Sequence, residues 1–420
     1  MSKEAVAPRS AAGKVLIIVE NLPVPFDRRV WQEATALHGA GYEVSIICPK
    51  GKGHNESYEV LNGIRIYRHA LPLEASGVLQ YAVEYSFALF SEFFLSLRVW
   101  RRHGFDLIHA CNPPDLIFLI ALVYKLFFGK KFLFDQHDIN PELYEVKFGR
   151  QGLVHFVLRL LERCTYRLAD GSLATSEALK ERAVASGLVP RDRVWVVRSF
   201  PDLDRFQRSL PDPILRRGHK YLVGYVGIMA EQDGVELLVR AMAHVVKVKG
   251  REDIGCIVIG DGPDFDRLRG LMAELGLGDH MQFAGYLSGD KLFSALSSCD
   301  IGVIPDPSNV CNDKLSMNKV FEYMALGLPF VQFDLPQAKA DAGDASMIVG
   351  SPTPEALGDG MIELLGDADR REQMAAYAIA RAHREFHWKV EKQTLLEAYG
   401  TLLPAASEKG TAALVDAPQQ

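Results

Sequence analysis

Three polar residues in one short segment, Ser316, Lys319 and Glu322, have the types and spacing of a site for a phosphorylated sugar. Ser316 is expected to cap a helix of about three turns, which Gly327 ends before an extended segment that opens at Pro329. The first turn of such a helix offers unpaired backbone N–H groups and a positive dipole end, and the lysine ammonium adds charge suited to a diphosphate. The glutamate, one turn further on, can accept hydrogen bonds from sugar hydroxyls. The alternative is an ordinary ion pair on a solvated helix face.

The chain that carries this segment is long enough for more than one domain. Its 420 residues allow two or three domains with substantial cores. A formal net charge of −6 gives no reason to expect nucleic-acid binding, which requires a basic surplus. The six cysteines form no C-x-x-C pair or zinc-like spacing, so we expect free thiols and no structural metal. The first dozen residues lack a secretory signal, which predicts a cytoplasmic protein.

Apolar segments with strand character alternate with helical segments along the whole chain. In the first half the expected strands are 14–20, 42–48, 106–109, 131–134, 171–174 and 194–197. After a stretch rich in Pro and Arg at 211–218, further strands are expected at 221–226, 255–260, 281–283, 300–304 and 329–331. Such alternation is typical of doubly wound parallel sheets, so the fold class is α/β with two Rossmann-like domains. Ligands of these sheets bind at the carboxyl ends of the strands, and a cleft between two such domains suits two substrates.

The expected boundaries follow from this pattern. We expect an N-terminal domain over 1–205 and a C-terminal domain over 215–386, with a last helix at about 387–403 packing back on the first domain. Residues 405–420 are small and polar and are expected to be disordered. Two apolar segments, 85–100 and 116–128, are too short or too interrupted by charges to span a bilayer, which needs about 20 apolar residues.

Several motifs agree with one known family. The stretches NKVFEYMALGLPFV, IGDGPDFDRL and GYVGIMAEQDGVELLVRAM in the second half, and DLIHACNPPDL, DQHDINPELY and VVRSFPDLDRF in the first, closely resemble the retaining family 4 glycosyltransferases of the GT-B fold, of the bacterial surface-polysaccharide type. The resemblance extends over 14–403. It implies metal-independent, front-face transfer of a sugar from a UDP- or GDP-linked donor to a glycan or polyprenyl-linked acceptor, in polysaccharide or lipopolysaccharide synthesis, without a further cofactor.

The resemblance also assigns the donor site. Glu322 would bind the ribose of the donor nucleotide, and the turn that precedes it would carry the diphosphate through Ser316, Met317, Asn318 and Lys319. At the end of the first strand of the second domain, Gly227 would let the backbone approach a phosphate, or would serve a tight turn, or both. The base would lie near 283–286.

Three departures from the family pattern concern charge. Many relatives carry an Arg and a Lys where this chain has Ile228 and Asp233, and a Glu where it has Lys314. We expect Lys314 and Lys319 to replace the missing positive charge, because departure of a nucleoside diphosphate needs charge stabilisation. The rival hypothesis is a donor site too degenerate to react.

In the first half, polar residues follow two neighbouring expected strands. His109, Cys111 and Asn112 end one strand, and His137 and Asp138 follow the next, which places both groups at the ligand edge. Relatives often have a catalytic-site histidine where this chain has Cys111. We therefore predict that His137, Asp138 and Asn112 contact the reacting region, with a structural histidine bonded to a nearby carbonyl as the alternative.

Basic residues supply the remaining candidates. Arg28 and Arg29, after the first strand, and Arg198 are predicted to bind a phosphate of donor or acceptor, or to be solvated charges. Family members often dock on the cytoplasmic membrane face, and by that resemblance a peripheral membrane contact at the inner face of the plasma membrane would use the aromatic and basic residues Phe93, Phe94, Trp100, Arg98, Arg101 and Arg102, unless their helix is buried.

Other functions stay open. Within the same fold, a nucleotide-sugar epimerase would react without an acceptor, and a non-catalytic scaffold would bind nucleotide sugar without turnover. An NAD-dependent dehydrogenase is disfavoured because no complete G-x-G-x-x-G follows the first strand of either domain.

Overall fold

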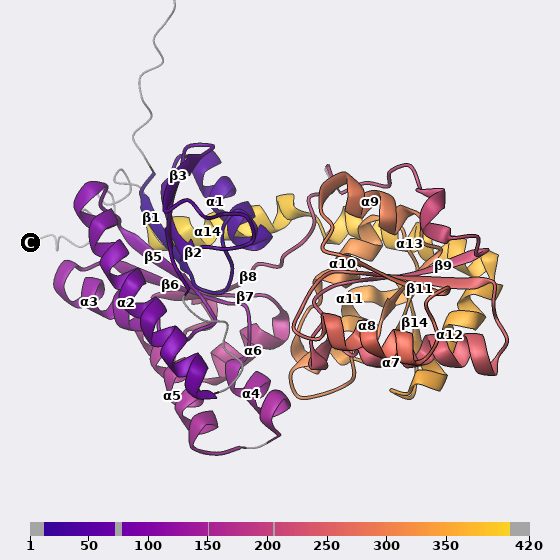
Figure 1. Ribbon diagram of the computed structural model, residues 1–420. Coiled ribbons are helices and arrows are strands. Elements are labelled where there is room, and N and C mark those ends of the chain that lie inside the picture. The colour runs from indigo at the N-terminus through magenta and orange to yellow at the C-terminus, as the bar shows by residue number, and fades with distance from the viewer. Residues whose placement is uncertain (1–11, 72–77, 150, 205, 404–420) are drawn as a thin grey trace, which may run out of the picture. The chain divides into compact units, whose positions relative to one another are not determined.

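The computed structural model in Figure 1 describes residues 12–71, 78–149, 151–204 and 206–403. The chain divides into two compact units, one of residues up to Leu143, Gln151–Val197 and residues from Glu391 onward, the other of Tyr144–Arg150 and Arg198–Val390. The expected disordered tail, 405–420, and the first eleven residues lie outside the described part of the chain.

The first unit is built on an eight-stranded sheet in the order β3-β4-β2-β1-β5-β6-β7-β8, parallel except for the β3–β4 pair. Its strands are β1 (Lys14–Val19), β2 (Glu43–Pro49), β3 (Tyr58–Leu61), β4 (Ile64–His69), β5 (Leu107–Cys111), β6 (Lys131–Gln136), β7 (Gly171–Ala174) and β8 (Val194–Val196). Its helices are α1 (Arg28–Gly39), α2 (Val78–Arg102), α3 (Phe118–Phe128), α4 (Asn140–Phe148), α5 (Leu153–Leu168), α6 (Glu177–Ala185) and α14 (Trp388–Leu402), with the unit boundary passing through α4 and α14.

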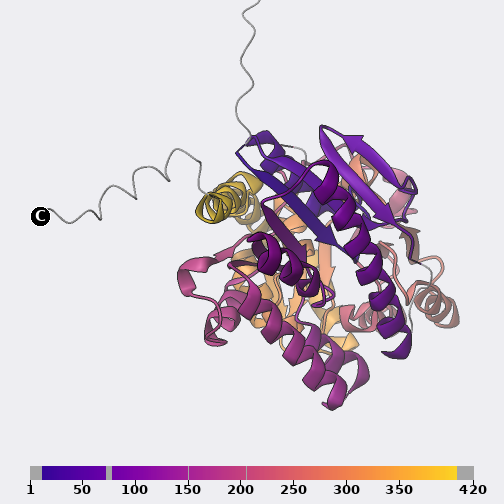
Figure 2. The same ribbon diagram turned by 90° about the vertical axis from the view of Figure 1, so that its left-hand side faces the viewer.

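Helices cover both faces of this sheet, as Figures 1 and 2 show. The strand order and right-handed crossovers place α1 on one face and α2, α3, α5 and α6 on the other. The C-terminal helix α14 lies on the α1 face, where Tyr399 packs edge-on against Tyr42 and contacts His109. Because all strands except β3 run parallel, their carboxyl ends share one edge, and the polar ends of β1, β5 and β6 come together there.

The second unit is built on a six-stranded parallel sheet in the order β11-β10-β9-β12-β13-β14. Its strands are β9 (Tyr221–Val226), β10 (Ile254–Ile259), β11 (Met281–Gly285), β12 (Ile301–Ile304), β13 (Phe330–Phe333) and β14 (Ser346–Val349). Its helices are α7 (Val235–Ala243), α8 (Phe265–Glu274), α9 (Gly289–Ser297), α10 (Asn318–Ala325), α11 (Pro336–Ala342), α12 (Pro354–Gly366) and α13 (Ala368–Glu385).

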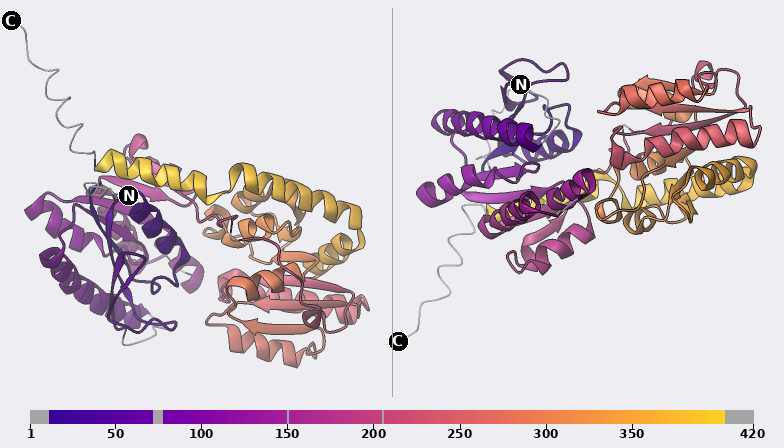
Figure 3. Two further views of the ribbon diagram at one scale, coloured as in Figure 1. Left: turned by 90° about the horizontal axis from the view of Figure 1, so that it is seen from above. Right: turned by 60° about the horizontal axis from the view of Figure 1, so that its bottom comes forward.

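This second sheet separates two apolar cores. One core joins α9, α10, α11 and α13 to the sheet around Phe200, Phe321 and Phe386, whose rings lie 4.6–5.0 Å apart. The other joins α7, α8 and α12 to the opposite face. Figure 3 shows helices on both sides of the sheet. The short helix α10 is thus held on the sheet by its own apolar residues.

The predicted α/β class with two Rossmann-like sheets is confirmed, and each expected strand is present within a few residues. Three strands were not expected. Two of them, β3 and β4, carry charged residues between their apolar ones, and β4 buries the ionic residue Arg68 as well as its apolar side chains. The third, β14, is a four-residue edge strand. Each of the three segments is short or interrupted by charged residues, so none has the long apolar run that marks the other strands.

Candidate functional site

Helix α10 differs from the expectation at its start. It begins at Asn318, Met317 occupies the N-cap position without a side-chain cap, and the hydroxyl of Ser316 instead donates to Asp341 Oδ2 at 2.7 Å. The prediction that Ser316 caps the helix is therefore wrong, and the eight residues make a little over two turns rather than three. The predicted stop is confirmed, since Gly327 follows the last turn with φ 57° and its N–H donates to Met324 O.

Tyr323 and Phe321 explain why α10 is fixed in place. The buried hydroxyl of Tyr323 lies 3.2 Å from the carbonyl oxygens of both Gly224 on β9 and Val303 on β12. Phe321 packs into the aromatic group of Phe200 and Phe386. Tyr323 anchors the helix to the two central strands of the sheet and Phe321 anchors it to the aromatic group, so its first turn has a defined position beside the loops that follow those strands.

Lys319 is buried in an ion-pair cluster. Its Nζ lies 2.9 and 2.7 Å from the two oxygens of Asp306, which follows β12, and 3.9 Å from Asp233 Oδ1. The ammonium also lies 5.0 Å from the ring centroid of Tyr225. The sequence did not single out Asp306, and no local pattern marks it, because its partner is a helix later in the chain. Two carboxylates therefore already balance the charge predicted to serve a diphosphate.

The pKa values of this cluster follow from burial and mutual charge. Burial alone would lower the pKa of Lys319, but Asp306 and Asp233 outweigh it and raise that pKa above its usual value. Burial raises the pKa of Asp233 to about 6, against the opposing effect of Lys319. Burial likewise raises the pKa of Asp306. The cluster thus carries no excess positive charge near neutral pH.

The other donor candidates lie around the start of α10. Glu322 is buried at 5% exposure within the helix, whereas Asn318 is exposed in its first turn. Lys314 ends a short 3₁₀ turn, Asn312–Lys314, and is partly exposed. Asn318 lies in the first turn of α10, Glu322 lies one turn further on, and Lys314 lies in the turn that precedes the helix. Their contact with a nucleotide stays a prediction.

Gly227 lies where the loops after β9 and β10 meet. Its N–H donates to Ile259 O at 3.0 Å, and a Cβ on Gly260 would fall 1.8 Å from the carbonyl oxygen of Gly227. A Cβ on Gly227 itself would meet the hydroxyl of Tyr225 at 2.7 Å. The contact with Tyr225 and the positive φ of 158° account for glycine at position 227, and the side chain of the next residue, Ile228, is exposed.

In the first unit, Asn112 is fully engaged. Its Nδ2 donates to Asp115 Oδ1 at 3.1 Å and to Asp138 O at 2.8 Å, and its Oδ1 accepts the N–H groups of His137 at 2.7 Å and Asp138 at 3.2 Å. These are the four hydrogen bonds that an asparagine side chain can make. The structure thus favours a role for Asn112 in holding the loop after β6, rather than the predicted contact with substrate.

His137 and Asp138, in the loop held by Asn112, keep their predicted place at the ligand edge of the sheet. The His137 side chain is 18% exposed. Its Nε2 lies 2.6 Å from Oδ2 of Asp135, which is near the end of strand β6. Burial would lower the pKa of His137, but Asp135 prevails and raises it above the usual value. Asp135 precedes His137 by two residues in DQHD, and this spacing was the signal that could have identified it.

The three candidate arginines have different environments. Arg29 is buried, with Nη2 lying 2.7 Å from Asp135 Oδ1 and 3.1 Å from Glu33 Oε1, so its charge is balanced inside the domain. This contact favours a structural role over the predicted phosphate clamp. Arg28 is exposed beside it at the start of α1. Arg198 is partly buried, and its guanidinium lies 5.8 Å from the ring of Phe200.

One group of side chains in the first unit has the types of a metal site. The ligand atoms of His109, Cys111 and Asp135 lie within 4.8 Å of one another. Both oxygens of Asp135, however, already bind Arg29 and His137. Nδ1 of His109 lies 2.7 Å from the hydroxyl of Tyr399. The donor set therefore fits a hydrogen-bonded network better than a cation.

Buried carboxyl groups in the first unit predict a stability that falls as the pH rises. Burial raises the pKa of Glu20 to about 8, with Glu92 adding to the effect, and raises the pKa of Glu33 and Asp115 to about 7 each. The folded form therefore holds protons that the unfolded chain releases above about pH 4 to 5. The stabilisation is complete below that range and is lost between about pH 5 and 8.

Between pH 5 and pH 8, the variant Glu20→Gln is expected to lose about 2 kcal/mol less free energy of unfolding than wild type, or to differ by more, since one pKa unit corresponds to about 1.4 kcal/mol. Urea unfolding at the two pH values measures it. The exposed Glu56→Gln serves as the control and should leave the pH dependence unchanged. Equal pH dependence in wild type and Glu20→Gln would contradict the proton-linked burial of Glu20.

Comparisons with known proteins cover both halves of the chain. Residues 27–205 match the family model described as Glycosyltransferase Family 4, and residues 207–381 match the model described as Glycosyl transferases group 1. The 2-deoxystreptamine N-acetyl-D-glucosaminyltransferase of Streptomyces fradiae is 26% identical over 297 residues, 67% of each chain. Matches to the D-inositol 3-phosphate glycosyltransferases of two Corynebacterium species are 26% identical and span about half of each relative's length, 54% and 52%.

Solved structures share the fold over nearly the whole chain. Sucrose-phosphate synthase from Thermosynechococcus elongatus superposes with a TM-score of 0.76 at 18% identity, over 93% of this chain and 99% of that one. Anabaena HepE in complex with UDP-glucose gives a TM-score of 0.69 at 14% identity, over 93% and 100%. With both sheets, the order of the motifs and both family models in agreement, the chain belongs to the family 4 glycosyltransferases, which have the GT-B fold and use nucleotide-sugar donors.

Proposed function

We propose that the protein transfers a hexose or hexose derivative from a UDP- or GDP-linked sugar to an acceptor hydroxyl, with retention and without a metal. The observation that carries the proposal is the buried carboxylate of Glu322, one turn into the anchored helix α10 and inside the segment matched by the group 1 model. HepE was crystallised with UDP-glucose, which makes UDP-glucose the first donor to test here.

The charges of the site support different roles for the two lysines and for the backbone of α10. Since Lys319 is paired with two carboxylates, the diphosphate would rely on the N–H groups of the first turn of α10 and on Lys314. The leaving diphosphate would accept the proton of the incoming hydroxyl. In the first unit, His137 and Asp138 are the groups at the ligand edge proposed to contact the reacting sugar.

The test is release of nucleoside diphosphate from a panel of UDP- and GDP-sugars, with and without polyprenyl-diphosphate-linked glycans as acceptors. Release that requires an acceptor supports the transferase. Acceptor-independent conversion would indicate an epimerase, and binding without turnover would indicate a scaffold. Absence of binding to every nucleotide sugar would overturn the donor-site proposal.

The acceptor is proposed to be a lipid-linked glycan of a surface polysaccharide or lipopolysaccharide, reached at an anionic membrane surface. None of the helices in the described ranges is both long and apolar enough to cross a membrane. Of the residues predicted to dock, Phe94 is 65% exposed, whereas Trp100 packs against Phe105 and Tyr124. Two exposed apolar rows support docking. The row on α2 contains Phe94 together with Val83, Phe87 and Phe90, and the row on α5 contains Leu153, Phe156, Val157 and Leu160.

Arginines flank the apolar rows and supply charge complementary to anionic lipid. The variant with Arg98, Arg101 and Arg102 all changed to Gln is expected to bind phosphatidylglycerol vesicles about 100-fold more weakly, at about 1 kcal/mol for each arginine. Vesicle co-sedimentation measures the partition.

A matched control changes three exposed arginines of the second unit, Arg240, Arg267 and Arg269, to Gln and should bind like wild type. Phe90→Ser with Phe94→Ser tests the apolar contribution. Wild-type protein that fails to bind phosphatidylglycerol vesicles would remove the membrane proposal.

A further inference from the structure

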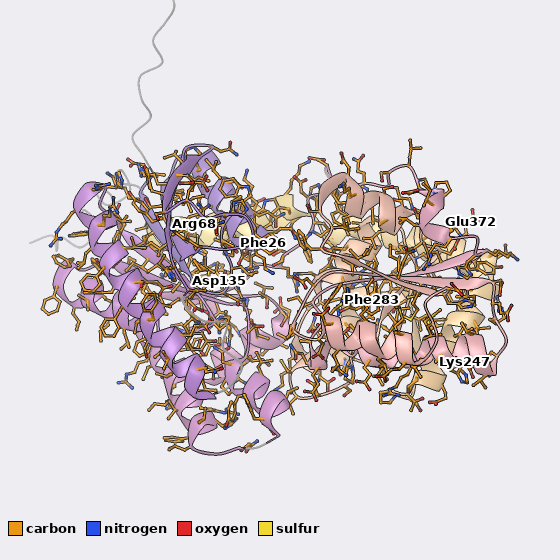
Figure 4. The ribbon with its side chains drawn as sticks, viewed as in Figure 1. Phe26, Arg68, Asp135, Lys247, Phe283 and Glu372 are labelled. Carbon is orange, nitrogen blue, oxygen red and sulfur yellow. The ribbon has the colours of Figure 1, made fainter. Side chains whose placement is uncertain are left out.

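A buried network in the first unit surrounds Asp135, which is labelled in Figure 4 and has no exposed surface. From α1, Arg29 Nη2 binds Asp135 Oδ1 at 2.7 Å, and Arg29 Nη1 donates to Val197 O at 2.7 Å. Arg29 draws the pKa of Asp135 well below its usual range, although burial opposes this. The carboxylate is therefore a fixed negative charge behind the loop that follows β6.

The imidazole of His137 approaches this carboxylate through one nitrogen. Its Nε2 lies 2.6 Å from Asp135 Oδ2 and 3.0 Å from Nε of Arg29. The arginine Nε always carries a hydrogen, which it can donate either to the imidazole or to Asp135 Oδ2 at 3.1 Å. If Nε2 were unprotonated, its lone pair would face a carboxylate oxygen at 2.6 Å. A proton on Nε2 turns that contact into a short charge-assisted hydrogen bond.

The backbone of the same residue is fixed independently. The N–H of His137 donates to Oδ1 of Asn112, whose side chain has no further hydrogen-bonding capacity. Within the part of the chain that the structure describes, no group hydrogen-bonds Nδ1 of His137, and the side chain is 18% exposed. The second ring nitrogen is thus the one available to a ligand.

Other titratable groups face the same carboxylate and set its surroundings. From β5, His109 Nε2 lies 3.4 Å and Cys111 Sγ 3.9 Å from Asp135 Oδ2. From α1, Glu33 lies within 3.1 Å of Arg29, and Asp27 precedes the helix as its N-cap. From α14, the hydroxyl of Tyr399 lies 2.7 Å from His109 Nδ1. Among these residues, His137 alone has a ring that reaches the surface, because His109 is fully buried.

We propose that Asp135 is a positioning residue that holds His137 in the Nε2–H tautomer and so makes Nδ1 the atom that gains and loses a proton. Neutral His137 then accepts a hydrogen bond from a sugar hydroxyl through Nδ1, and protonated His137 donates one. The part concerning the sugar rests on the proposed transferase function. The tautomer itself does not, because it follows from the contacts with Asp135 and Arg29.

The test is a long-range ¹H–¹⁵N correlation spectrum of the full chain labelled at histidine, with His137 assigned by its loss in His137→Gln. At a pH where the ring is neutral, we expect Nε2 to show the shift of a protonated nitrogen and Nδ1 that of an unprotonated one. The reverse pattern, or an even mixture of tautomers, overturns the proposal. This measurement needs no change at Asp135, so it stands even if Asp135 variants fail to fold.

Two variants test whether Asp135 is the residue that sets the tautomer of His137. Asp135→Asn is expected to mix the tautomers and to shift the His137 titration at least tenfold in proton affinity towards lower pH. Glu33→Gln, which alters a neighbour of Arg29 that is not hydrogen-bonded to His137, is the matched control and should leave the tautomer unchanged. An unchanged tautomer and titration in folded Asp135→Asn would refute the assignment. Absence of turnover with every nucleotide sugar would count against the proposed function alone.

Discussion

Replacing Lys319 with methionine is expected to destabilise the second unit by about 3–5 kcal/mol, the usual cost of leaving a buried charge without its partner. The substitution would strand the buried carboxylate of Asp306, whose two oxygens lie within 3 Å of the ammonium, beside Asp233. Equilibrium urea unfolding measures the change, and hydrogen exchange of peptides from β9 and β12 locates it in the second sheet.

The matched control is Lys339→Met. Lys339 forms an ion pair with Asp334 in the same unit at 3.0 Å, but both side chains are 54% exposed, so the expected change is below about 1 kcal/mol. Equal effects of the two substitutions would show that the buried ion pair contributes no more to stability than the exposed one. The double variant Lys319→Met with Asp306→Leu should recover much of the stability, since it removes both members of the buried pair.

The recovered double variant also separates the two roles considered for Lys319. If the ammonium only fixes α10 to the end of β12, nucleotide affinity returns with stability. If it also binds the diphosphate, affinity stays low while stability recovers. Lys314→Met, at a partly exposed position, tests the other half of the compensation hypothesis. Unchanged turnover in both the double variant and Lys314→Met would refute compensation.

Glu322→Gln is expected to weaken binding of the nucleoside diphosphate about 10- to 100-fold. Hydrogen bonds to a charged group contribute about 1.5–3 kcal/mol each, and the amide keeps the shape while losing the charge that ribose hydroxyls would recognise. Isothermal titration with UDP and with GDP measures the affinity, and a thermal melt checks that the fold is intact.

Glu274→Gln, at an exposed position on α8, is the matched control for this measurement and should bind like wild type. Folded Glu322→Gln with unchanged affinity for the nucleotide that wild type binds would exclude Glu322 from the ribose contact. A loss of affinity together with a large fall in melting temperature would instead assign Glu322 a structural role beside the core around Phe200, Phe321 and Phe386.

Sequence reasoning succeeded where short-range pattern decides structure. Eleven of the strands and the last helix are visible in the sequence, because buried parallel strands are continuous apolar runs and surface helices repeat every 3.6 residues. It placed Gly327 at the end of α10 correctly, since a positive φ favours glycine there. It misplaced the start of that helix, because Ser316 has a tertiary hydrogen-bond partner in Asp341 that no local rule reveals.

The candidate site shows the same division more sharply. The sequence predicts phosphate binding for Arg29 and Lys319, but both are paired with carboxylates that other elements contribute, Asp135 on β6 and Asp306 after β12. Asp135 is 106 residues from Arg29 along the chain. A charged side chain indicates a ligand site only when it is known whether another residue of the protein already pairs with it. Those pairings depend on which strand ends the order of the sheet brings together.

The sequence by itself determined two α/β halves, the family to which they belong, and the segments that lie at the ligand edges, because burial periodicity and short motifs are local properties of the chain. Only the tertiary structure decided which of those polar residues are paired with groups inside the protein. Helix α14 brings Tyr399 to His109 across 290 residues of sequence, and α10 brings Lys319 to Asp306. Ion pairs and hydrogen bonds depend on distances in space. The partners and the protonation state of each candidate residue therefore follow from the tertiary structure and not from the sequence.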